Sequence, residues 1–457
     1  MPYIGRHRTE TGKSVGLAIQ SSATLLDMSW KLPISAYRRH GDPICRQAAE
    51  RATARQEIDT FSLIFRVLYL TTISRKIALM NLRFFATTLL TTLATSHTQA
   101  ATSSETCLRD LRALPGFLLE NDTGARQHLA QKGQAYFDNA LASASEAAAK
   151  ANDEATCNLA LGDYLSKWRK GHLQIVPGNA WKHEQPAPAP SSAAAQTAAI
   201  DDRMPSLQLL SSQTALLTLP SFFPEYAKVI ADLLASKRDE LASRANWIID
   251  VRRNNGGSDS SYAPLSPWIA SGESVNVGGE WLSTQANIGN QENICALYAP
   301  GDATCTIYMA QAVIRMRSVQ PGQFVAQSAG GPVSYASFPG QAVQPARVAV
   351  LVDRDCGSSC EEFLLEARQS FRVKLIGRSS GGALDYSNLR LQALPSGLRQ
   401  LAYATSRSAR LPQLQVDLGG IMPDIYLPPP KDEAERAQEV LRVQRWLEGG
   451  TLRPDGV

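Results

Sequence analysis

The sequence predicts an α/β fold with a largely parallel sheet, and three observations support this prediction. From Pro205 onward, short apolar runs alternate with segments that carry apolar residues at helical spacing. Within residues 347–388, a strand, a tight polar turn, a helix and a second strand follow one another. Before this region, residues 107–170 are rich in alanine and show helical spacing. Strands that alternate with helices are typical of parallel sheets, because a parallel pair of strands needs a long crossover connection.

The length and the charge of the chain limit the class of protein. With 457 residues, of which 44% are hydrophobic, the chain can bury a sizeable core and has room for two or three domains. The formal net charge of +4 is unevenly distributed, since residues 1–79 contain twelve Lys and Arg but six Asp and Glu. The remainder therefore carries a net charge of about −2, which gives no reason to expect a nucleic acid as a partner.

The N-terminal residues have the features of a leader. Residues 1–79 are basic and irregular, whereas residues 80–100 have a short region with Arg83, an apolar stretch from Phe84 and small residues before the expected cleavage point. This pattern indicates a secretory signal peptide. We therefore expect that translation starts at Met80, that residues 1–79 are upstream sequence, and that the mature protein is periplasmic or secreted, without stable membrane insertion. The alternative is a cytosolic extension followed by a signal anchor.

The cysteine content agrees with export. Outside the leader, which contains Cys45, the chain has six cysteines, and an even number in an exported chain permits full pairing. Their order suggests three local disulfides out of fifteen possible connectivities: Cys107–Cys157, Cys295–Cys305 and Cys356–Cys360. The last pair could equally remain free thiols. No zinc-type spacing is present, and we expect neither a metal nor a cofactor.

Two segments separate the leader from the core. Residues 101–177 are predicted to form a small helical cap of two or three helices, because apolar residues recur at i, i+3 and i+4. Residues 178–204 are rich in Pro, Ala and Ser. This composition cannot build a core, so these residues are interpreted as a semi-extended linker.

Residues 205–430 are predicted to form the α/β core. Apolar runs bounded by polar turns predict strands at Thr214–Pro220, Asn246–Val251, Val348–Val352 and Val373–Ile376, and helical spacing predicts helices at Tyr226–Ser243 and Glu361–Ser370. We expect an antiparallel β excursion over Ser274–Tyr308, an extended Leu401–Leu411, and a turn and strand over Val416–Leu427. Residues 431–457 are predicted to contain a charged amphipathic helix and a tail.

The turn between the strand at Val348–Val352 and the following helix is the expected reaction centre. Such a turn lifts a side chain to the carboxyl end of the sheet and aims backbone N–H groups at the same point. Ser358 and Ser359 occupy the turn, and one of them is predicted to be a nucleophile.

Three motifs resemble those of the C-terminal processing (tail-specific) serine peptidases. They are a strand and glycine loop (NWIIDVRRNNGG), a nucleophile turn (VAVLVDRDCGSSCEEF) and a terminal strand (LGGIMPDIYL), and the similarity covers roughly residues 205–430. The resemblance implies a crotonase/Clp-protease-like core and hydrolysis of a polypeptide substrate. The linker is too short for the PDZ module that this branch usually inserts between cap and core.

The same resemblance assigns roles to individual residues. The family nucleophile falls on Ser358. The developing oxyanion would be stabilised by the backbone of Ser359, at a helix N-terminus, and by the backbone of Gly256 or Gly257, since glycine lets the main chain approach a carbonyl closely.

The general base is expected to be a histidine. Tail-specific members use a lysine in the loop after the nucleophile, but here Ala383 occupies that position. A second branch, which includes tricorn and the interphotoreceptor retinoid-binding proteins, uses a histidine in a segment that residues 170–175 resemble, which points to His172. Of the other histidines beyond the leader, His128 is interpreted as a solvated surface residue and His183 lies in the linker.

An acidic partner is expected to orient this imidazole, whose unperturbed pKa of about 6.5 suits proton transfer near neutrality. The histidine branch has a carboxylate just before the terminal strand, and this position falls on Asp417. Asp385 and Glu361 are alternatives, whereas Asp424 is interpreted as a turn residue.

The sequence therefore favours an exported serine peptidase with a Ser-His-acid constellation. A catalytically inactive, peptidase-like binding protein for an apolar or peptide ligand is the alternative. A crotonase-type enzyme acting on thioesters is a third possibility, weakened by the export signal because coenzyme A substrates are cytosolic.

Overall fold

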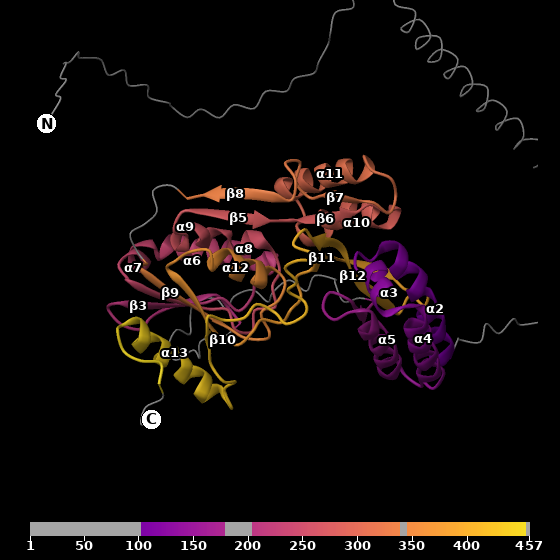
Figure 1. Ribbon diagram of the computed structural model, residues 1–457, viewed down its shortest axis with the longest axis horizontal. Helices are drawn as coiled ribbons and strands as arrows, with labels where there is room; N and C mark the ends of the chain where they lie inside the picture. The colour runs from indigo at the N-terminus through magenta and orange to yellow at the C-terminus, as the bar shows by residue number, and fades with distance from the viewer. Residues whose placement is uncertain (1–101, 179–202, 339–344, 454–457) are drawn as a thin grey trace, which may run out of the picture. The chain divides into compact units, whose positions relative to one another are not determined.

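The computed structural model describes residues 102–178, 203–338 and 345–453 (Figure 1). The expectations for residues 1–79 and 80–100, for most of the linker and for His183 concern positions outside these ranges. Within the described ranges, none of the helices combines the length and apolar character needed to cross a membrane.

A six-stranded, mainly parallel sheet forms the centre of the core, which confirms the predicted α/β class. In spatial order its strands are β13 (Ile425–Tyr426), β10 (Val373–Gly377), β9 (Arg347–Val352), β4 (Asn246–Asp250), β3 (Thr214–Thr218) and β2 (Ser206–Leu209). All neighbouring pairs are parallel except β2 with β3. Every residue of β4 is buried, as expected for a strand that is covered on both faces.

Helices cover both faces of this sheet (Figure 1). One face packs against α6 (Pro224–Ser236), α7 (Arg238–Ala242), α8 (Asp259–Tyr262), the 3₁₀ turn η1 (Ala263–Leu265), α9 (Ser266–Ile269) and α12 (Ser359–Ala367). The other face packs against α13 (Glu433–Leu447), the predicted C-terminal helix. Alternate residues of each strand point to opposite faces, so Ile249 and Val350 contact the first group whereas Ile248 and Leu351 contact α13.

A second, antiparallel sheet connects the core with the N-terminal helices. Its strands are β1 (Gln174–Pro177), β6 (Gly279–Leu282), β7 (Phe324–Ala326), β11 (Tyr386–Ala393) and the long β12 (Arg399–Ser408). Strand β12 pairs with β1, β6 and β11. Because β1 directly follows the helices and β12 comes late in the core, this pairing joins the N-terminal helices to the core.

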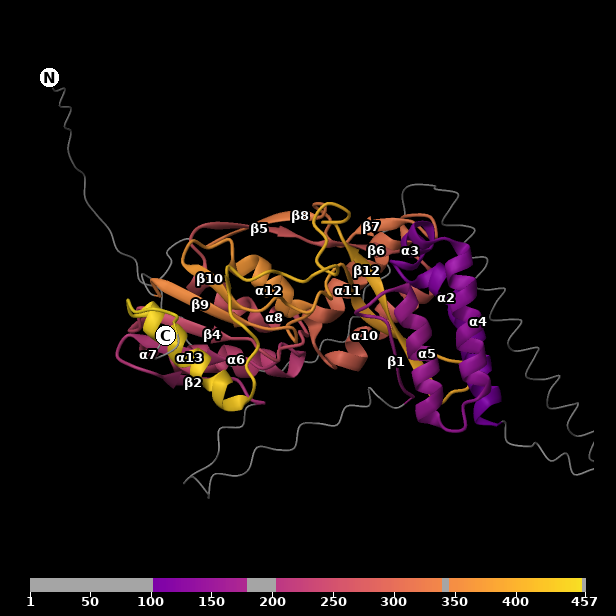
Figure 2. The same ribbon diagram turned by 60° about the horizontal axis from the view of Figure 1, so that its bottom comes forward.

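The N-terminal cap contains four helices rather than the two or three predicted. They are α2 (Ser103–Asn121), α3 (Ala125–Lys132), α4 (Gln134–Ala149) and α5 (Glu154–Trp168), and they lie beside β1 and β12 (Figure 2). Capping boxes at Thr102 and Asp153 define the starts of α2 and α5. The cap core includes Leu401 and Tyr403 of β12, so the cap is packed onto the second sheet.

The prediction of an antiparallel β excursion over Ser274–Tyr308 is wrong for most of this range. After β5 (Glu273–Val277), which pairs with β8 (Val333–Ser337), and after β6, the chain forms α10 (Gln285–Tyr298) and α11 (Ala303–Arg317). The buried face of α10 includes the polar Asn287 and Gln291, which disguise its helical periodicity. Side-chain oxygens of Thr284 and Asp302 cap the two helices.

All three predicted disulfides are present. Cys107–Cys157 joins α2 to α5, and Cys295–Cys305 joins α10 to α11. Cys356–Cys360 spans the turn between β9 and α12, and both of its residues are fully buried.

Candidate active site

Ser358 lies in a sharp turn between β9 and α12, with φ of 57° and ψ of −126°. A non-glycine residue at positive φ is strained by about 1 to 3 kcal/mol and persists only where its surroundings hold it. Gly256 packs directly against the turn, since a Cβ at Gly256 would lie 2.4 Å from the Gly357 oxygen and 2.7 Å from the Ser358 Cβ. The glycine loop after β4 is therefore shaped to fit the serine turn.

Glu361, one of the possible acids, is fully buried and ties this turn to the loop after β10. Its carboxylate accepts hydrogen bonds from the Ser358 N–H (3.3 Å), the Ser380 hydroxyl (2.5 Å) and the N–H groups of Gly382 and Ala383 (2.8 Å each). Burial raises the pKa of Glu361, while these hydrogen bonds oppose that change. The carboxylate thus holds two loops together and makes no hydrogen bond to an imidazole in the described chain.

His172 follows α5 in a turn with φ of 42°, and its ring is fixed by a main-chain group. Nδ1 lies 2.5 Å from the carbonyl oxygen of Tyr386, the first residue of β11. Because a carbonyl only accepts, Nδ1 carries the proton and Nε2 remains free to accept one. Burial, together with the Arg169 charge, lowers the pKa of His172 to about 4, so the imidazole is neutral at pH 7.

The buried Arg169, which the sequence analysis did not single out, organises the His172 turn. Its guanidinium pairs with Asp122 at 2.5 Å and donates to the carbonyl oxygens of Gly171 and His172. It also lies 5.2 Å from the centre of the Tyr386 ring. Arg169 thus touches both the turn that carries the imidazole and the residue whose carbonyl orients it. Its position directly after α5 and near His172 is the one feature of the sequence that could have indicated this role.

Ala383 links the serine turn to the histidine turn. A Cβ at Gly171 would lie 3.1 Å from the Ala383 Cβ, and a Cβ at Gly357 would lie 3.7 Å from the same atom. The immediate neighbours of His172 and Ser358 therefore pack on one residue, although they are distant in the sequence. This residue occupies the position at which the tail-specific pattern has its lysine.

Asp417 and Asp385 bind backbone rather than the imidazole. Asp417 accepts from the N–H groups of Leu384 and Asp385, both at 2.7 Å. Asp385 in turn accepts from the N–H groups of Val416 and Asp417, at 2.9 to 3.0 Å. In the described chain neither carboxylate is hydrogen-bonded to His172, whose Nδ1 partner is the Tyr386 carbonyl instead of the expected acid. Burial raises the pKa of Asp417 to about 7.

The three N–H groups that were expected to stabilise the oxyanion differ in whether they already donate to another group. The Gly256 N–H donates to the Asn254 side chain at 2.9 Å, so it is already engaged. The N–H groups of Gly257 and Ser359 have no hydrogen-bond acceptor in the part of the chain that the structure describes. Gly257 is held by pairing with Phe222, and the Ser359 nitrogen would lie 3.0 Å from a Cβ on Gly256. Two of the three expected groups can therefore receive an oxyanion.

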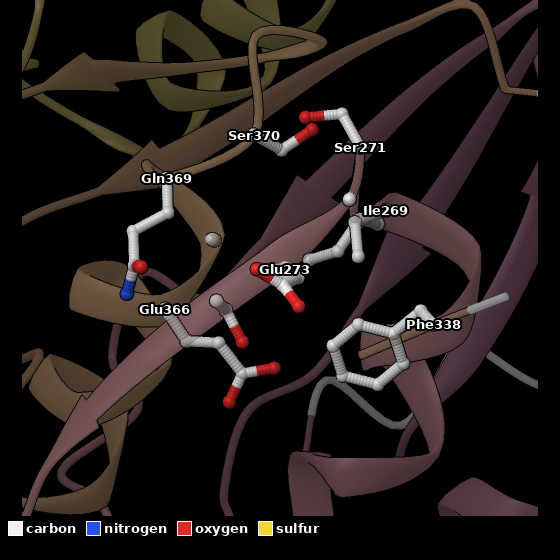
Figure 3. Close-up of a pocket in the computed structure, with 11 residues that line it drawn as sticks. Ile269, Ser271, Glu273, Phe338, Glu366, Gln369 and Ser370 are labelled. Atoms are coloured by element: carbon white, nitrogen blue, oxygen red, sulfur yellow. The ribbon is translucent and has the colours of Figure 1, made fainter. Parts of the chain in front are cut away.

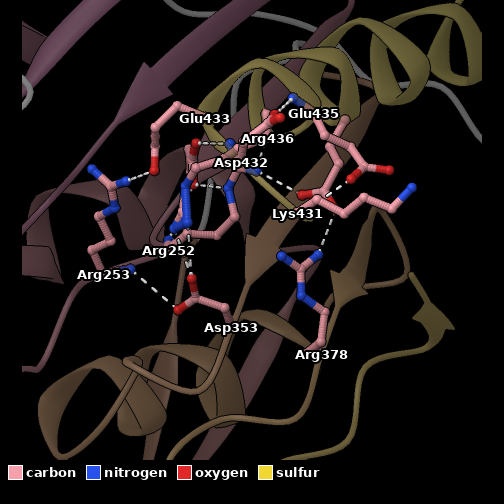
Figure 4. Close-up of polar contacts among 11 residues, drawn as sticks. Arg252, Arg253, Asp353, Arg378, Lys431, Asp432, Glu433, Glu435 and Arg436 are labelled. Carbon is pink, nitrogen blue, oxygen red and sulfur yellow. Dashed lines mark hydrogen bonds and ion pairs between the residues drawn. The ribbon is translucent and has the colours of Figure 1, made fainter. Parts of the chain in front are cut away.

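Helix α13 braces the loops of this site through buried charges (Figure 4). The fully buried Glu439 pairs with Arg252, after β4, and with Arg378, after β10, both at 2.7 Å. Arg436 pairs with Asp353, after β9, at 2.8 Å. The three loops at the carboxyl ends of neighbouring parallel strands are thus attached to one helix.

His128 is not the solvated surface residue that was expected. Its ring lies 5.6 Å from the ring of Tyr386, and its Nε2 is buried without a hydrogen-bond partner among the described residues. Burial and the Arg169 charge lower its pKa to about 4. Tyr386, which comes from a distant part of the sequence, covers this face of α3. Asp424, interpreted as a turn residue, accepts from the Leu375 N–H of β10 at 2.8 Å and pairs with Arg368 at 3.2 Å, so its side chain connects separate segments instead.

Comparisons with known proteins identify the fold and the family. Residues 213–427 match the model of peptidase family S41. No curated protein sequence matches the chain. Among solved structures, a crystal structure of a CPAF mutant is similar at 11% identity with a TM-score of 0.50, covering 76% of this chain and 98% of that one. A lipoprotein from Streptococcus agalactiae matches at 13% identity and a TM-score of 0.42, covering 80% and 99%.

The family match spans the loops around Ser358 but not the His172 turn or α13. It begins just before β3 and ends just after β13, and so includes the glycine loop, the serine turn and the loop that carries Ala383. Cap and linker lie before it. Residues 213–427 of the chain thus match peptidase family S41, and this match supports a serine-type peptidase.

Proposed function

We propose that this protein is an exported peptidase that hydrolyses peptide bonds with Ser358 as nucleophile and His172 as general base. The observation that carries the proposal is the shared packing of both turns on Ala383, next to a serine held in a strained turn. No lysine stands at this position, whereas the turn that packs on it carries a neutral imidazole whose Nε2 can accept a proton.

The proposed reaction uses these groups in the following steps. His172 Nε2 accepts the proton of the Ser358 hydroxyl as its oxygen attacks the substrate carbonyl carbon. The negative charge that forms on the carbonyl oxygen is stabilised by the N–H groups of Ser359 and Gly257. The imidazolium then protonates the leaving amine as the C–N bond breaks, and a water molecule hydrolyses the acyl-enzyme by the same steps.

In this proposal the Tyr386 carbonyl orients the His172 imidazole. Asp417 does not contact the imidazole but positions the segment that carries this carbonyl. Through the N–H groups of Leu384 and Asp385, the Asp417 carboxylate fixes the segment that leads into Tyr386. The Asp385 carboxylate in turn accepts hydrogen bonds from the N–H groups of Val416 and Asp417, so the two aspartates bind each other's segments. A carbonyl dipole can hold the Nδ1–H tautomer as a carboxylate does, although it stabilises the imidazolium less.

Export is the second part of the proposal. Three disulfides in the described chain are typical of proteins that mature in an oxidising compartment. The signal-peptide pattern of residues 80–100 supports the same conclusion. N-terminal sequencing of the exported protein should find a start near Ala101, and a start elsewhere would contradict cleavage at this point.

The catalytic proposal is tested by labelling the mature protein with a fluorophosphonate, which reacts with activated serines. We expect labelling of the wild type, none of Ser358→Ala and none of His172→Ala, since the second variant cannot activate the hydroxyl. Ser318→Ala, at the end of α11, is the matched control and should label normally. A folded wild type that never labels would favour the alternative of an inactive binding protein.

A further inference from the structure

An acidic surface begins directly beside the nucleophile. Asp259 is the first residue of α8, which follows the glycine loop, and the nearby hydroxyl of Ser359 acts to lower its pKa. Helix α8 packs on α12, whose Glu362 and Glu366 are one turn apart and so lie on the same side of the helix. Carboxylates therefore continue from the serine turn along α12.

The protein neutralises only one of these carboxylates with an ion pair. Glu362 is paired with both guanidinium nitrogens of Arg410, at 2.8 and 2.7 Å. Asp259, Glu366 and the nearby Glu273 of β5 have no ion-pair partner in the described ranges. The surface consequently has an excess of negative charge where a substrate would lie.

The titration of these groups reflects this excess. Desolvation of its carboxyl group, followed by the charge of Glu362, raises the pKa of Asp259 to about 6, although the residue as a whole is exposed. Burial and the same neighbour raise the pKa of Glu366. A bound cation would stabilise the charged form of these two neighbouring carboxylates, which otherwise resist ionisation.

A tyrosine that packs into the core marks the inner end of this surface. Tyr262 is 6% exposed, and its ring is packed 5.6 Å from the rings of both Phe222 and Phe363. No hydrogen bond to its hydroxyl is present among the described residues. Burial, followed by the charges of Asp259 and Glu366, raises the pKa of Tyr262, which lies on the same helix as Asp259.

A buried hydroxyl without a partner lines a hollow at the outer end of this surface. Ser274 is 5% exposed and its Oγ has no hydrogen-bond partner. It lines a space of about 270 Å³, part of it open to solvent, together with Glu366, Glu273 and Phe338. Figure 3 shows the two carboxylates and the Phe338 ring directed toward the same space. A buried hydroxyl without a partner is rare, so the one on Ser274, beside two carboxylates that have no ion pair, points to a ligand that donates hydrogen bonds.

The chemistry of these groups selects the ligand. Carboxylates accept hydrogen bonds and hydroxyls can accept them, whereas ammonium and guanidinium groups only donate and carry the opposite charge. Helix α12 rises about 1.5 Å per residue, so Glu366 lies about 10 Å along the helix from Ser359. An extended peptide covers this distance in about three residues.

We propose that these groups form a subsite, here called the acidic subsite, which binds a lysine or arginine side chain of the polypeptide substrate about three residues from the scissile bond. It consists of Asp259, Tyr262, Glu273, Ser274 and Glu366. The inference rests on the proposed peptidase function, because it places the peptide at Ser358.

The test measures binding separately from catalysis. Two fluorescent hexapeptide mixtures are compared, with lysine or the uncharged norleucine fixed at one position and the other positions varied equally. With the Ser358→Ala protein, fluorescence anisotropy should show about tenfold tighter binding of the lysine mixture. Adding Glu366→Gln or Asp259→Asn should remove most of this preference. Adding Glu146→Gln, an exposed glutamate of α4, should leave it unchanged.

The preference should also depend on pH. The charged and titratable groups that act on Asp259 are Glu362 and Glu366 from α12, Arg410 from the segment after β12, Tyr262 from α8 and Tyr308 from α11. Because Asp259 ionises near pH 6, the lysine preference should increase from about pH 5 to about pH 7.5.

The outcomes separate this inference from the proposed function. Equal affinity for the two mixtures, or a lysine preference that survives both substitutions, would overturn the acidic subsite even if fluorophosphonate still labels Ser358. A lysine preference that both substitutions remove would support the subsite, even in a protein whose wild type fails to label and so contradicts the catalytic proposal.

Discussion

At the scale of single residues, the site is a set of main-chain positions that side chains hold in place. His172 is fixed at Nδ1 by the carbonyl of Tyr386, and its own carbonyl is held by Arg169. Ser358 is strained and fits because Gly256 has no side chain. The reacting atoms therefore depend on neighbours that do not take part in the chemistry.

The first prediction concerns pH. Since the pKa of His172 is lowered to about 4, the imidazole is available as a base well below neutrality. The acid limb of the kcat/KM profile should therefore lie nearer pH 4 than pH 6.5 if the free enzyme titrates as described. A limb at 6.5, measured with a neutral peptide, would contradict the buried environment of this ring.

The same lowered pKa affects stability. The unfolded chain binds a proton at this histidine below about pH 6.5, whereas the folded chain binds it only near pH 4. The stability that the neutral His172 contributes is therefore complete above pH 6.5 and is lost as the pH falls toward 4. His128, with the same lowered pKa, should act in the same direction.

The second prediction concerns Arg169. Its replacement by alanine leaves Asp122 as a buried, unpaired charge and frees the turn that carries His172. We expect a loss of about 3 to 5 kcal/mol in unfolding free energy and of about a hundredfold in kcat, with a smaller change in KM. Arg169→Lys keeps the charge and should recover more stability than kcat, because one ammonium cannot reach all of these acceptors. Equal recovery of both would indicate a purely structural role.

At the scale of elements, the serine turn is enclosed by a disulfide. Cys356 and Cys360 lie two residues before and after Ser358, and their side chains are part of the core that supports α12. The bond restrains the two ends of a strained turn, whereas Glu361 restrains its middle.

The third prediction separates this positioning effect from stability. Replacing Cys356 and Cys360 together by alanine should cost about 2 kcal/mol of stability and lower kcat by about tenfold or more, because the turn can relax. The matched control replaces Cys295 and Cys305, which close another short loop between α10 and α11. It should lose similar stability, measured by denaturant unfolding, with kcat retained. A parallel loss of kcat in both double variants would argue against a local effect.

At the scale of the whole molecule, the site is assembled from regions that are far apart in the sequence. The cap supplies His172, the antiparallel sheet supplies the Tyr386 carbonyl, and the parallel sheet supplies Ser358 and the glycine loop. Helix α13, on the opposite face of the parallel sheet, holds the loops after β4, β9 and β10 (Figure 4).

The fourth prediction concerns Glu439 of α13. Glu439→Gln leaves two buried guanidinium groups, of Arg252 and Arg378, without their shared anion. We expect a loss of about 3 to 5 kcal/mol in unfolding free energy, measured with urea. Glu433→Gln, which removes an exposed pair with Arg253 on the same helix, should cost less than about 1 kcal/mol. Similar losses in the two variants would show that burial of the network contributes little.

Some parts of the structure could be read from local sequence and others could not. The strands of the parallel sheet were predictable because they are continuous apolar runs, and the disulfides because their cysteines are close in order. Helices α10 and α11 were not, since Asn287 and Gln291 occupy buried positions that usually carry apolar residues. His128 was misjudged because the residue that covers it, Tyr386, belongs to another element.

The sequence by itself determined the α/β class, the S41-type motifs and the identity of Ser358 and His172 as candidates, because these depend on residue types at short spacing. Tertiary structure alone decided what surrounds them. The partner of His172 is a backbone carbonyl, which every residue possesses and which no sequence pattern marks. The excess negative charge of the acidic subsite likewise depends on the packing of α8, α12 and β5. Whether a carboxylate forms an ion pair depends on its distance from a cationic side chain in the folded chain, which the sequence does not give.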